Sequence, residues 1–369
     1  MRLALSGGGT GGHVYPALTI SEALECELAP AERLELIYLG SRTGVEAELV
    51  ERAGVPLRPI ASAPIRGRRP WEMASNALKL GRGTLQARTA LREFAPQVVL
   101  STGGYASFPA ALAARSRGIP LAVYLPDLSP GWAVRSIARL AQRVAVTAEE
   151  SLDRLPNKKG VLTGYPVRKE FWQANRIDGR RRLGLDAEEK VLFVAGASQG
   201  AHSINLAISR QLRGLLELCE VVHLCGNTDE RWLRGLRDEL PAELRDRYHL
   251  FAYLHDEIPW AMAAADLALC RSGASVMGEL PAVGLPAILV PYPHAGGHQR
   301  VNARYLADNS AAVILEDRDL GSMLPLVGQL LHDMARLRSM SDAARRLARP
   351  DAADRIARLL LDLARGGKE

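Results

Sequence analysis

A histidine closes a glycine-rich loop near the N-terminus. The chain reads Gly7-Gly8-Gly9-Thr10-Gly11-Gly12-His13 between a short apolar run and a helix-like stretch. Glycines let backbone N–H groups approach an anion where the helix begins, and they clear the space around the imidazole. Because imidazole can take up a proton near neutral pH, His13 is a candidate general base for a hydroxyl nucleophile, provided that an acid or a carbonyl orients it. The alternative is a surface or helix-capping histidine.

The same loop also has features of two nucleotide-binding motifs. Gly7, Gly9 and Gly12 match the spacing G-x-G-x-x-G, but the second expected strand ends at Gly40-Ser41 without the acidic residue that binds a ribose. A P-loop needs lysine after its last glycine, where this chain has His13. Both nucleotide interpretations of the first loop are therefore weak.

A later stretch has the chemistry of a nucleoside diphosphate site. It runs Arg271-Ser272-Gly273-Ala274-Ser275-Val276 and reaches Glu279 within the same expected helix. A helix that begins in this segment offers N–H groups and the positive end of its dipole to a diphosphate. Glu279, about two turns in, could accept hydrogen bonds from both ribose hydroxyls, and its alternative is a surface acid. Gln299 and Asn302 are either loop amides or partners for sugar hydroxyls.

Histidines after this block raise the question of a metal. His294 and His298 are four residues apart, but Ala-Gly-Gly between them argues against a helix and no third ligand is evident. We expect no metal site, and we expect no Asp-x-Asp motif to hold a metal-bound diphosphate.

Apolar runs of strand length alternate with amphipathic stretches of helix length, as is typical of βα units around parallel sheets. The expected strands are Arg2–Ser6, Leu34–Leu39, Gln97–Ser101, Leu121–Leu125 and Arg143–Val146 in the first half, and Lys190–Ala195, Glu220–Cys225, His249–Ala252, Leu267–Cys270, Ala287–Val290 and Ala312–Ile314 in the second. Each half opens with a strand, a glycine loop and a helix, so two Rossmann-like domains are expected, with a ligand between the carboxyl ends of their sheets. Pro156–Val167 is the expected linker, and Asp351–Arg365 is a final helix with no strand after it.

The charge of the chain is concentrated in one segment. Of its 369 residues, 47 are basic and 41 acidic, and the segment from Arg58 to Arg92 holds eight of the basic ones but only one acid. A nucleic-acid binder more often spreads its basic residues over a domain, so we expect no nucleic-acid partner. The N-terminus lacks the pattern of a signal peptide, no apolar stretch is long enough to span a bilayer, and the four cysteines form no C-x-x-C pair. A cytoplasmic protein with reduced thiols is expected.

Five motifs, in order along nearly the whole chain, resemble the MurG family. They are Gly8-Gly9-Thr10-Gly11-Gly12-His13, Thr102-Gly103-Gly104-Tyr105 with Pro109, Pro166-Val167-Arg168, Ser198-Gln199-Gly200-Ala201, and the block from Arg271 to Asn302. That family transfers N-acetylglucosamine (GlcNAc) from UDP-GlcNAc to lipid I, which is undecaprenyl-pyrophosphoryl-MurNAc-pentapeptide, and so forms lipid II for peptidoglycan.

The resemblance implies the α/β GT-B fold, with two Rossmann-like parallel-sheet domains separated by a cleft and the C-terminal helix packing back on the N-terminal domain. Residues 1–163, with about 350–369, would form the acceptor- and membrane-binding domain. Residues 164–349 would bind UDP-GlcNAc.

Roles for single residues follow from the resemblance alone. Ala274, Ser275 and Val276 would offer N–H groups to the diphosphate, Arg168 and Ser198 would approach the phosphates, and Glu279 would hold the ribose. Leu254, His255 and Ile258 would surround uracil, and His298, Gln299 and Asp127 would contact the donor sugar. Gln199 and Gly200 complete the donor set. Thr10, Gly11 and Gly12 are also included among the donor-binding residues, although the resemblance places their loop, with His13, on the acceptor side. Gly103, Gly104 and Tyr105 would line the acceptor side.

One four-residue segment and two single positions depart from the family pattern. Tyr124-Leu125-Pro126-Asp127 stands where His-Glu-Gln-Asn is usual, Tyr165 replaces an asparagine, and His202 replaces an arginine. The first change removes an imidazole and a carboxylate from the acceptor region and leaves the detail of acceptor binding open.

The implied reaction is a single inverting displacement that needs no metal or other cofactor. The basic segment would then dock on the anionic cytoplasmic face of the membrane, as a peripheral contact through Ile65, Arg66, Arg68, Arg69, Trp71, Lys79 and Arg82. A solvated helix face is the alternative for this segment. Other cell-wall synthesis proteins are further expected partners. The competing functions are another GT-B enzyme, such as a UDP-GlcNAc 2-epimerase or a glycolipid synthase, and a non-catalytic scaffold that binds nucleotide sugars.

Overall fold

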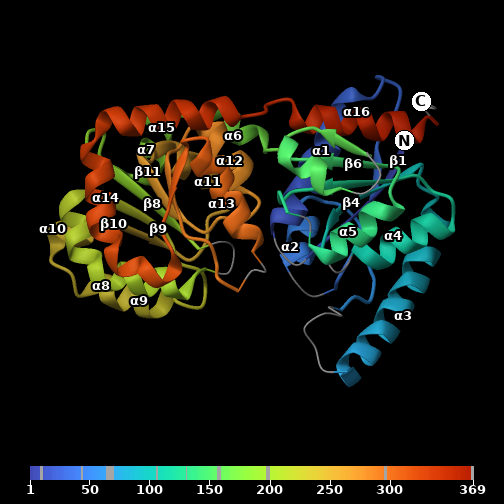
Figure 1. Cartoon of the computed structure of the whole chain (residues 1–369), viewed down its shortest axis with the longest axis horizontal. Coiled ribbons are helices and arrows are strands. Elements are labelled where there is room, and N and C mark those ends of the chain that lie inside the picture. Colours follow the sequence, from blue (N-terminus) through green and yellow to red (C-terminus); the bar gives the residue numbers. More distant parts are fainter. Residues whose placement is uncertain are drawn as a thin grey trace. The chain divides into compact units, whose positions relative to one another are not determined.

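Two compact units make up the chain. The computed structural model describes residues 1–8, 11–42, 45–63, 70–104, 107–129, 131–155, 159–196, 200–294 and 297–366. The first unit comprises Met1–Arg168 with Arg349–Glu369, and the second comprises Lys169–Ala348 (Figure 1). The boundary expected from the sequence is 163/164, with a return at about 350.

The sheet of the first unit has seven parallel strands among the described residues, in the order β3-β2-β1-β4-β5-β6-β7. The strands are β1 (Arg2–Gly7), β2 (Glu35–Gly40), β3 (Leu57–Pro59), β4 (Val98–Gly103), β5 (Leu121–Leu125), β6 (Arg143–Val146) and β7 (Gly160–Leu162). The helical segments are α1 (Gly11–Glu27), α2 (Val45–Arg52), α3 (Pro70–Phe94), α4 (Ser107–Ser116), α5 (Trp132–Leu140), the 3-10 turn η1 (Glu149–Arg154) and α16 (Ala352–Ala364). The strand order reverses between β1 and β4, which is where doubly wound sheets bind ligands.

In the second unit the described residues form six parallel strands in the order β10-β9-β8-β11-β12-β13. The strands are β8 (Val191–Ala195), β9 (Glu220–Leu224), β10 (Tyr248–Phe251), β11 (Leu267–Cys270), β12 (Ala287–Leu289) and β13 (Ala312–Ile314). The helical segments are α6 (Lys169–Gln173), α7 (Arg176–Leu183), α8 (His202–Leu218), α9 (Glu230–Asp238), α10 (Ala242–Arg245), α11 (Ile258–Ala264), α12 (Val276–Val283), α13 (His298–Asp308), the 3-10 turn η3 (Asp317–Ser322), α14 (Met323–His332) and α15 (Met334–Leu347). The expected α/β class with two Rossmann-like sheets is thus confirmed.

Two edge strands were not expected from the sequence. β7 lies inside 156–167, so the interpretation of that whole stretch as a linker was wrong. β7 pairs in parallel with β6, and Leu162 of β7 lies opposite Val146 of β6. β3 pairs with β2 and ends in Pro59, which has no N–H to donate and is tolerated only at the edge of a sheet. Each strand has three residues, too few to show a periodic pattern.

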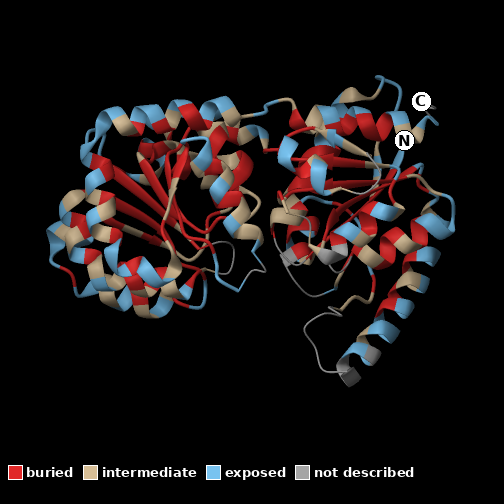
Figure 2. Cartoon of the chain, viewed as in Figure 1, coloured by how far each residue is buried: buried red, intermediate tan, exposed pale blue. Residues whose placement is uncertain are grey.

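The strands are buried on both faces, which explains their continuous apolar sequences. Figure 2 shows the strands of each unit buried beneath helices whose outer faces are exposed. In the first unit α16 packs along α1, with Ile356 and Leu360 fully buried and Arg358 paired with Glu27 at 2.8 Å. The final helix therefore packs on the N-terminal domain, as expected.

Within the part of the chain that the structure describes, the helices are either too short or too polar to cross a bilayer.

Candidate functional site

The imidazole of His13 is oriented by a backbone carbonyl. Its Nδ1 lies 2.7 Å from the carbonyl oxygen of Thr102, and the Thr102 hydroxyl donates in return to the His13 carbonyl at 2.6 Å. A carbonyl oxygen only accepts, so Nδ1 carries the proton in this contact and Nε2 of the neutral ring has the lone pair. This arrangement supplies the orienting group that a general base requires.

Glycines allow the loop after β4 to approach the loop after β1. Gly103 has φ +98°, and a Cβ there would lie 3.1 Å from His13 Cε1. Gly104 has φ +84°, and its Cβ would lie 2.2 Å from the Gly8 carbonyl oxygen. A side chain at Gly104 would push the two loops apart and disturb the bond between His13 and Thr102. The structure thus brings His13, Gly103 and Gly104 together beside Gly11 and Gly12 at the start of α1.

Arg168 and Asp127 also lie in the first unit. The Arg168 guanidinium carbon lies 4.6 Å from the centre of the Tyr15 ring on α1. Asp127 is half-buried just after β5. Lys79 and Arg82 are exposed on α3.

Tyr124 and Tyr165, two of the departures from the family pattern, contact each other. Their ring centres are 6.1 Å apart in an edge-to-face arrangement, and the Tyr124 hydroxyl shares a 2.9 Å hydrogen bond with Thr147. Burial, with a smaller contribution from Asp127, raises the pKa of Tyr124 well above its ordinary value despite the Thr147 hydrogen bond. Position 124 therefore supplies a neutral core residue that packs against Tyr165.

Loops that follow neighbouring parallel strands form the candidate donor site in the second unit. Gly200 follows β8 with φ +81°, and a Cβ there would lie 2.2 Å from the Cys225 carbonyl oxygen. Ala274 and Ser275 follow β11, and Val276 begins α12. Half-buried Glu279 lies in the first turn of this helix, nearer its start than the two turns expected from the sequence. Because β8 and β11 are adjacent and parallel, these loops share the carboxyl edge of the sheet.

The remaining residues expected near the donor lie at other helix starts. His298 and Gln299 open α13, where the Gln299 side-chain oxygen accepts from the Tyr292 N–H at 2.9 Å. Leu254 and His255 lie between β10 and α11, the helix that Ile258 begins. The His255 ring packs edge-on against Tyr253, with ring centres 4.5 Å apart.

Arg271 connects the loops of the candidate donor site through hydrogen bonds and an ion pair. It is buried, it pairs with Asp317 at 2.5 Å, and it donates to the Ser203 hydroxyl at 2.7 Å and to the Val290 carbonyl at 3.2 Å. Buried Asn302 donates to the Ser272 carbonyl at 3.2 Å. Arg271 therefore joins the end of β11 to α8, η3 and the end of β12.

The chain does contain an Asp-x-Asp sequence, Asp317-Arg318-Asp319, so the expectation that it has none was wrong. Asp317 accepts from Arg271 and Ser203. Asp319 lies 3.6 Å from Arg318. These carboxylates are paired within the protein. Across the described ranges, no three His, Cys, Asp or Glu side chains gather as a metal would require.

A hydrogen-bond network at the start of α8, buried except for the exposed His202 and the half-buried Trp232, was missed by the sequence reasoning. Asp229 accepts from the His202 ring at 3.0 Å, from Asn205 at 2.7 Å and from Trp232 at 2.9 Å. Asn205 in turn accepts from His223 at 3.0 Å, whose other nitrogen bonds the Tyr248 hydroxyl at 2.8 Å. The sequence signal was only the three-residue spacing of His202 and Asn205, which places both on one side of a helix.

This network fixes the protonation of its members. Burial lowers the pKa of His223 to about 3, so the ring is neutral. Burial alone would raise the pKa of Asp229, but the hydrogen bonds from Trp232, Asn205 and His202 outweigh it and lower the pKa. Asp229 therefore stays ionised and holds the first turn of α8.

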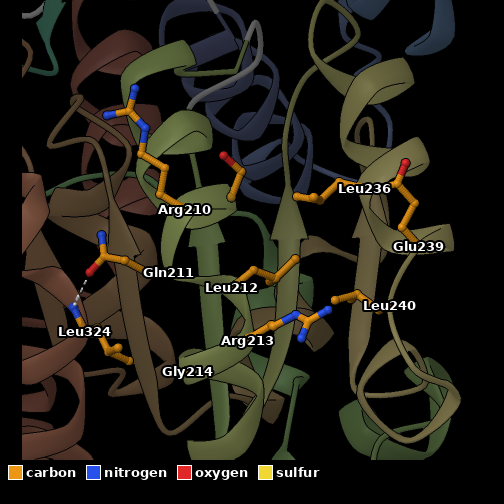
Figure 3. A pocket seen from close by; sticks show the side chains of 10 residues that line it. Arg210, Gln211, Leu212, Arg213, Gly214, Leu236, Glu239, Leu240 and Leu324 are labelled. Atoms are coloured by element: carbon orange, nitrogen blue, oxygen red, sulfur yellow. Dashed lines mark hydrogen bonds between the residues drawn. The ribbon is translucent and has the colours of Figure 1, made fainter.

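A surface cavity of about 380 Å³ lies elsewhere on the second unit (Figure 3). Residues of α8, the end of α9 and Leu324 of α14 line it, and Gln211 bridges two segments by accepting from the Leu324 N–H and donating to the Leu320 carbonyl, both at 3.0 Å. It includes no residue of the expected donor or acceptor sites, and we assign it no function.

Several expected site residues lie outside the described residues. They are Thr10, Tyr105, Ser198, Gln199, Ile65, Arg66, Arg68 and Arg69. Trp71 lies in α3, but its side chain is not described.

Comparison with known proteins identifies the family. The glycosyltransferase family 28 N-terminal domain matches residues 3–146, and the C-terminal domain of that family matches residues 191–356. A UDP-N-acetylglucosamine–N-acetylmuramyl-(pentapeptide) pyrophosphoryl-undecaprenol N-acetylglucosamine transferase of Roseiflexus sp. (strain RS-1) is 41% identical over 98% of this chain and 94% of its own length. The transferase of the same name from Moorella thermoacetica is 39% identical over 100% of both chains. The chain belongs to the MurG family.

Solved structures agree with this assignment. Acinetobacter baumannii MurG is 25% identical and superposes with a TM-score of 0.73 over 98% of this chain and 99% of that one. A UDP-GlcNAc 2-epimerase from Neisseria meningitidis has a TM-score of 0.69 over 98% of this chain and 100% of that one, at 15% identity. At that identity the epimerase shows only that the fold is shared. The MurG family is thus favoured over the epimerase alternative.

We predict that His223 makes the stability of the chain depend on pH. Between its ordinary pKa of 6.5 and its folded value of about 3, the unfolded chain binds a proton that the folded chain does not. The free energy of unfolding should therefore fall as the pH drops below 6.5, by up to about 1.4 kcal/mol per pH unit from this residue. Urea unfolding of wild type and His223→Gln at pH 7 and at pH 5.5 measures the effect.

The variant should be less stable at pH 7 but lose less stability on acidification. The exposed His332 provides the matched control, because His332→Gln should keep the wild-type pH dependence. An unchanged pH dependence in His223→Gln would contradict the buried neutral assignment.

Proposed function

We propose that the chain transfers GlcNAc from UDP-GlcNAc to the 4-hydroxyl of lipid-linked MurNAc-pentapeptide, forming lipid II in peptidoglycan synthesis. Membership of the MurG family supports the donor and acceptor, since its curated relatives bear the name of this transferase. The observation that carries the chemistry is the hydrogen bond that fixes Nδ1 of His13 on the Thr102 carbonyl.

The reaction is a single displacement with inversion at the anomeric carbon. His13, through Nε2, takes the proton of the acceptor hydroxyl as its oxygen bonds to C1 of GlcNAc. The bond from C1 to the diphosphate oxygen breaks on the opposite face, and UDP leaves with that electron pair. The glycines around His13 leave room for a sugar hydroxyl to approach the ring.

Negative charge grows on the diphosphate as it leaves, so its binding groups act most strongly in the transition state. The N–H groups at the start of α12 and the Arg168 guanidinium are the proposed groups, with Ser198 as a further partner. Glu279 would bind the ribose, and His298 and Gln299 the sugar. We propose that these groups suffice without a divalent metal.

The long helix α3 is the proposed membrane contact of the first unit. Leu78 and Leu85 are 77% and 68% exposed, and their seven-residue spacing places them on one face with Arg82 between them. Lys79 flanks this face, whereas Leu80, Ala87 and Leu91 of the same helix are buried. Exposed leucines beside cations suit the headgroup region of an anionic membrane. Peripheral binding at the cytoplasmic face would bring the first unit to its lipid-linked acceptor.

Incubation of the purified chain with labelled UDP-GlcNAc and a lipid I analogue tests the function. Label should appear in the lipid product, should require the acceptor and should persist in the presence of EDTA. Turnover of UDP-GlcNAc without acceptor would instead indicate an epimerase. Saturable UDP-GlcNAc binding with no transfer would indicate a scaffold, and activity that EDTA abolishes and magnesium restores would contradict the metal-free mechanism.

Replacement of His13 by alanine should lower kcat by about 10²–10⁴-fold, the usual contribution of a general base. UDP affinity should stay near that of wild type, because the proposed donor-binding N–H groups belong to α12. Steady-state kinetics together with calorimetric titration of UDP separate the two effects. If kcat is unchanged, His13 is not the base.

Binding to phosphatidylglycerol vesicles should weaken as salt is raised, because surface cations are screened. Combined replacement of Arg66, Arg68 and Arg69 by glutamate, and replacement of Leu78 and Leu85 by serine, should each reduce binding in a sedimentation assay. Ile177→Ser removes a side chain that is 79% exposed on α7 of the second unit and should leave binding unchanged. Binding that ignores salt and both sets of substitutions would refute the α3 surface.

A further inference from the structure

Tyr15 holds a cation at the start of the helix that carries His13. The Arg168 guanidinium carbon lies 4.6 Å from the centre of the Tyr15 ring, well within the distance at which a cation is attracted to an aromatic face. Both residues belong to the first unit. Tyr15 was assigned no role from the sequence or the family resemblance.

Both partners of this contact are fixed by their surroundings. Tyr15 is half-buried in the first turns of α1, and its ring lies against Gly11, where a Cβ would come within 3.4 Å of the ring carbons. Arg168 follows Tyr165, Pro166 and Val167, which are all buried. The backbone thus anchors one end of the Arg168 side chain, and the Tyr15 ring anchors the other.

Stacking on a ring is compatible with binding phosphate. An aromatic ring contacts the flat face of a guanidinium, whereas phosphate oxygens bind the N–H groups at its edge. Arg271 shows that the two kinds of contact can coexist, because its guanidinium carbon lies 5.2 Å from the centre of the Tyr292 ring while its N–H groups bond Asp317, Ser203 and Val290. The environment of Arg168 suits an arginine that is oriented for an anionic ligand.

We propose that Tyr15 is a positioning residue whose ring orients Arg168 toward the diphosphate of UDP-GlcNAc. The inference rests on the proposed function, since it takes the donor as a UDP-sugar. The ring acts through Arg168 and restricts the guanidinium before the ligand arrives, so less side-chain freedom is lost on binding. The first turns of α1 would then carry two functions, the proton acceptor at His13 and, through Tyr15, the orientation of a charge that stabilises the leaving group.

A double-mutant cycle tests the coupling of the two residues. It compares wild type, Tyr15→Leu, Arg168→Met and the double variant by UDP affinity and by kcat and KM for UDP-GlcNAc. Tyr15→Leu should weaken UDP affinity and kcat/KM by about 3- to 10-fold, the range of a partly buried cation–π contact. Tyr15→Phe keeps the ring face and should stay within about twofold of wild type. In the Arg168→Met background, Tyr15→Leu should have no further effect.

Controls distinguish positioning from damage to the fold. Arg182 stacks on Trp260 at 3.8 Å in the second unit, so Trp260→Leu removes a comparable contact and should leave UDP affinity unchanged. Circular dichroism and thermal unfolding verify each variant, and Tyr15→Met replaces Tyr15→Leu in the cycle if the leucine variant does not fold.

The inference is overturned if Tyr15→Leu is equally harmful with and without Arg168, if Tyr15→Phe is as impaired as Tyr15→Leu, or if only the KM for the lipid acceptor changes. Failure of the proposed function would appear in wild type itself, as absent transfer. If wild type then still binds UDP, the cycle in UDP affinity decides the inference separately. If wild type does not bind UDP, both proposals fail.

Discussion

The hydrogen bond between His13 and the Thr102 carbonyl is the interaction on which the chemistry proposed for the first unit depends. It exists because β1 and β4 are adjacent and parallel, so the loops that follow them meet at one edge of the sheet. The close approach of those loops in turn requires glycine at positions 103 and 104. The orientation of the His13 imidazole therefore depends both on the strand order and on the glycines of the two loops. The Rossmann topology is what places the proposed base.

In the second unit, the loops of the candidate donor site are held in place by side chains as well as by glycines. Buried Arg271 and Asn302 connect these loops to one another. Asp229 holds the first turn of α8 by accepting hydrogen bonds from His202 and Asn205. Buried polar groups of this kind are costly unless each has a partner, so removing one partner disturbs several loops together. The N–H groups proposed to bind the diphosphate are thereby set in place before the ligand arrives, which is the condition for electrostatic stabilisation of a leaving group.

Charge is used differently in the two units. Arg271 is buried and paired with Asp317, Arg168 lies over the Tyr15 ring, and the cations of α3 are exposed beside leucines. A buried pair stabilises a loop, a stacked guanidinium can still bind an anion at its edge, and exposed cations attract an anionic surface over a distance set by salt. The basic excess of the sequence thus falls on the unit proposed to meet the membrane.

The sequence by itself determined the fold class and the strands of both sheets apart from two short edges, and it singled out the segments proposed to carry the chemistry. Those features depend on local patterns, namely apolar runs, glycine loops and their order along the chain. Only the tertiary structure decided which groups meet: Thr102 with His13, Tyr15 with Arg168, Tyr124 with Tyr165, and Asp229 with three donors. These pairs join residues 24 or more positions apart in all but one contact, that of Asp229 with Trp232, and no local pattern specifies which distant strand ends become neighbours.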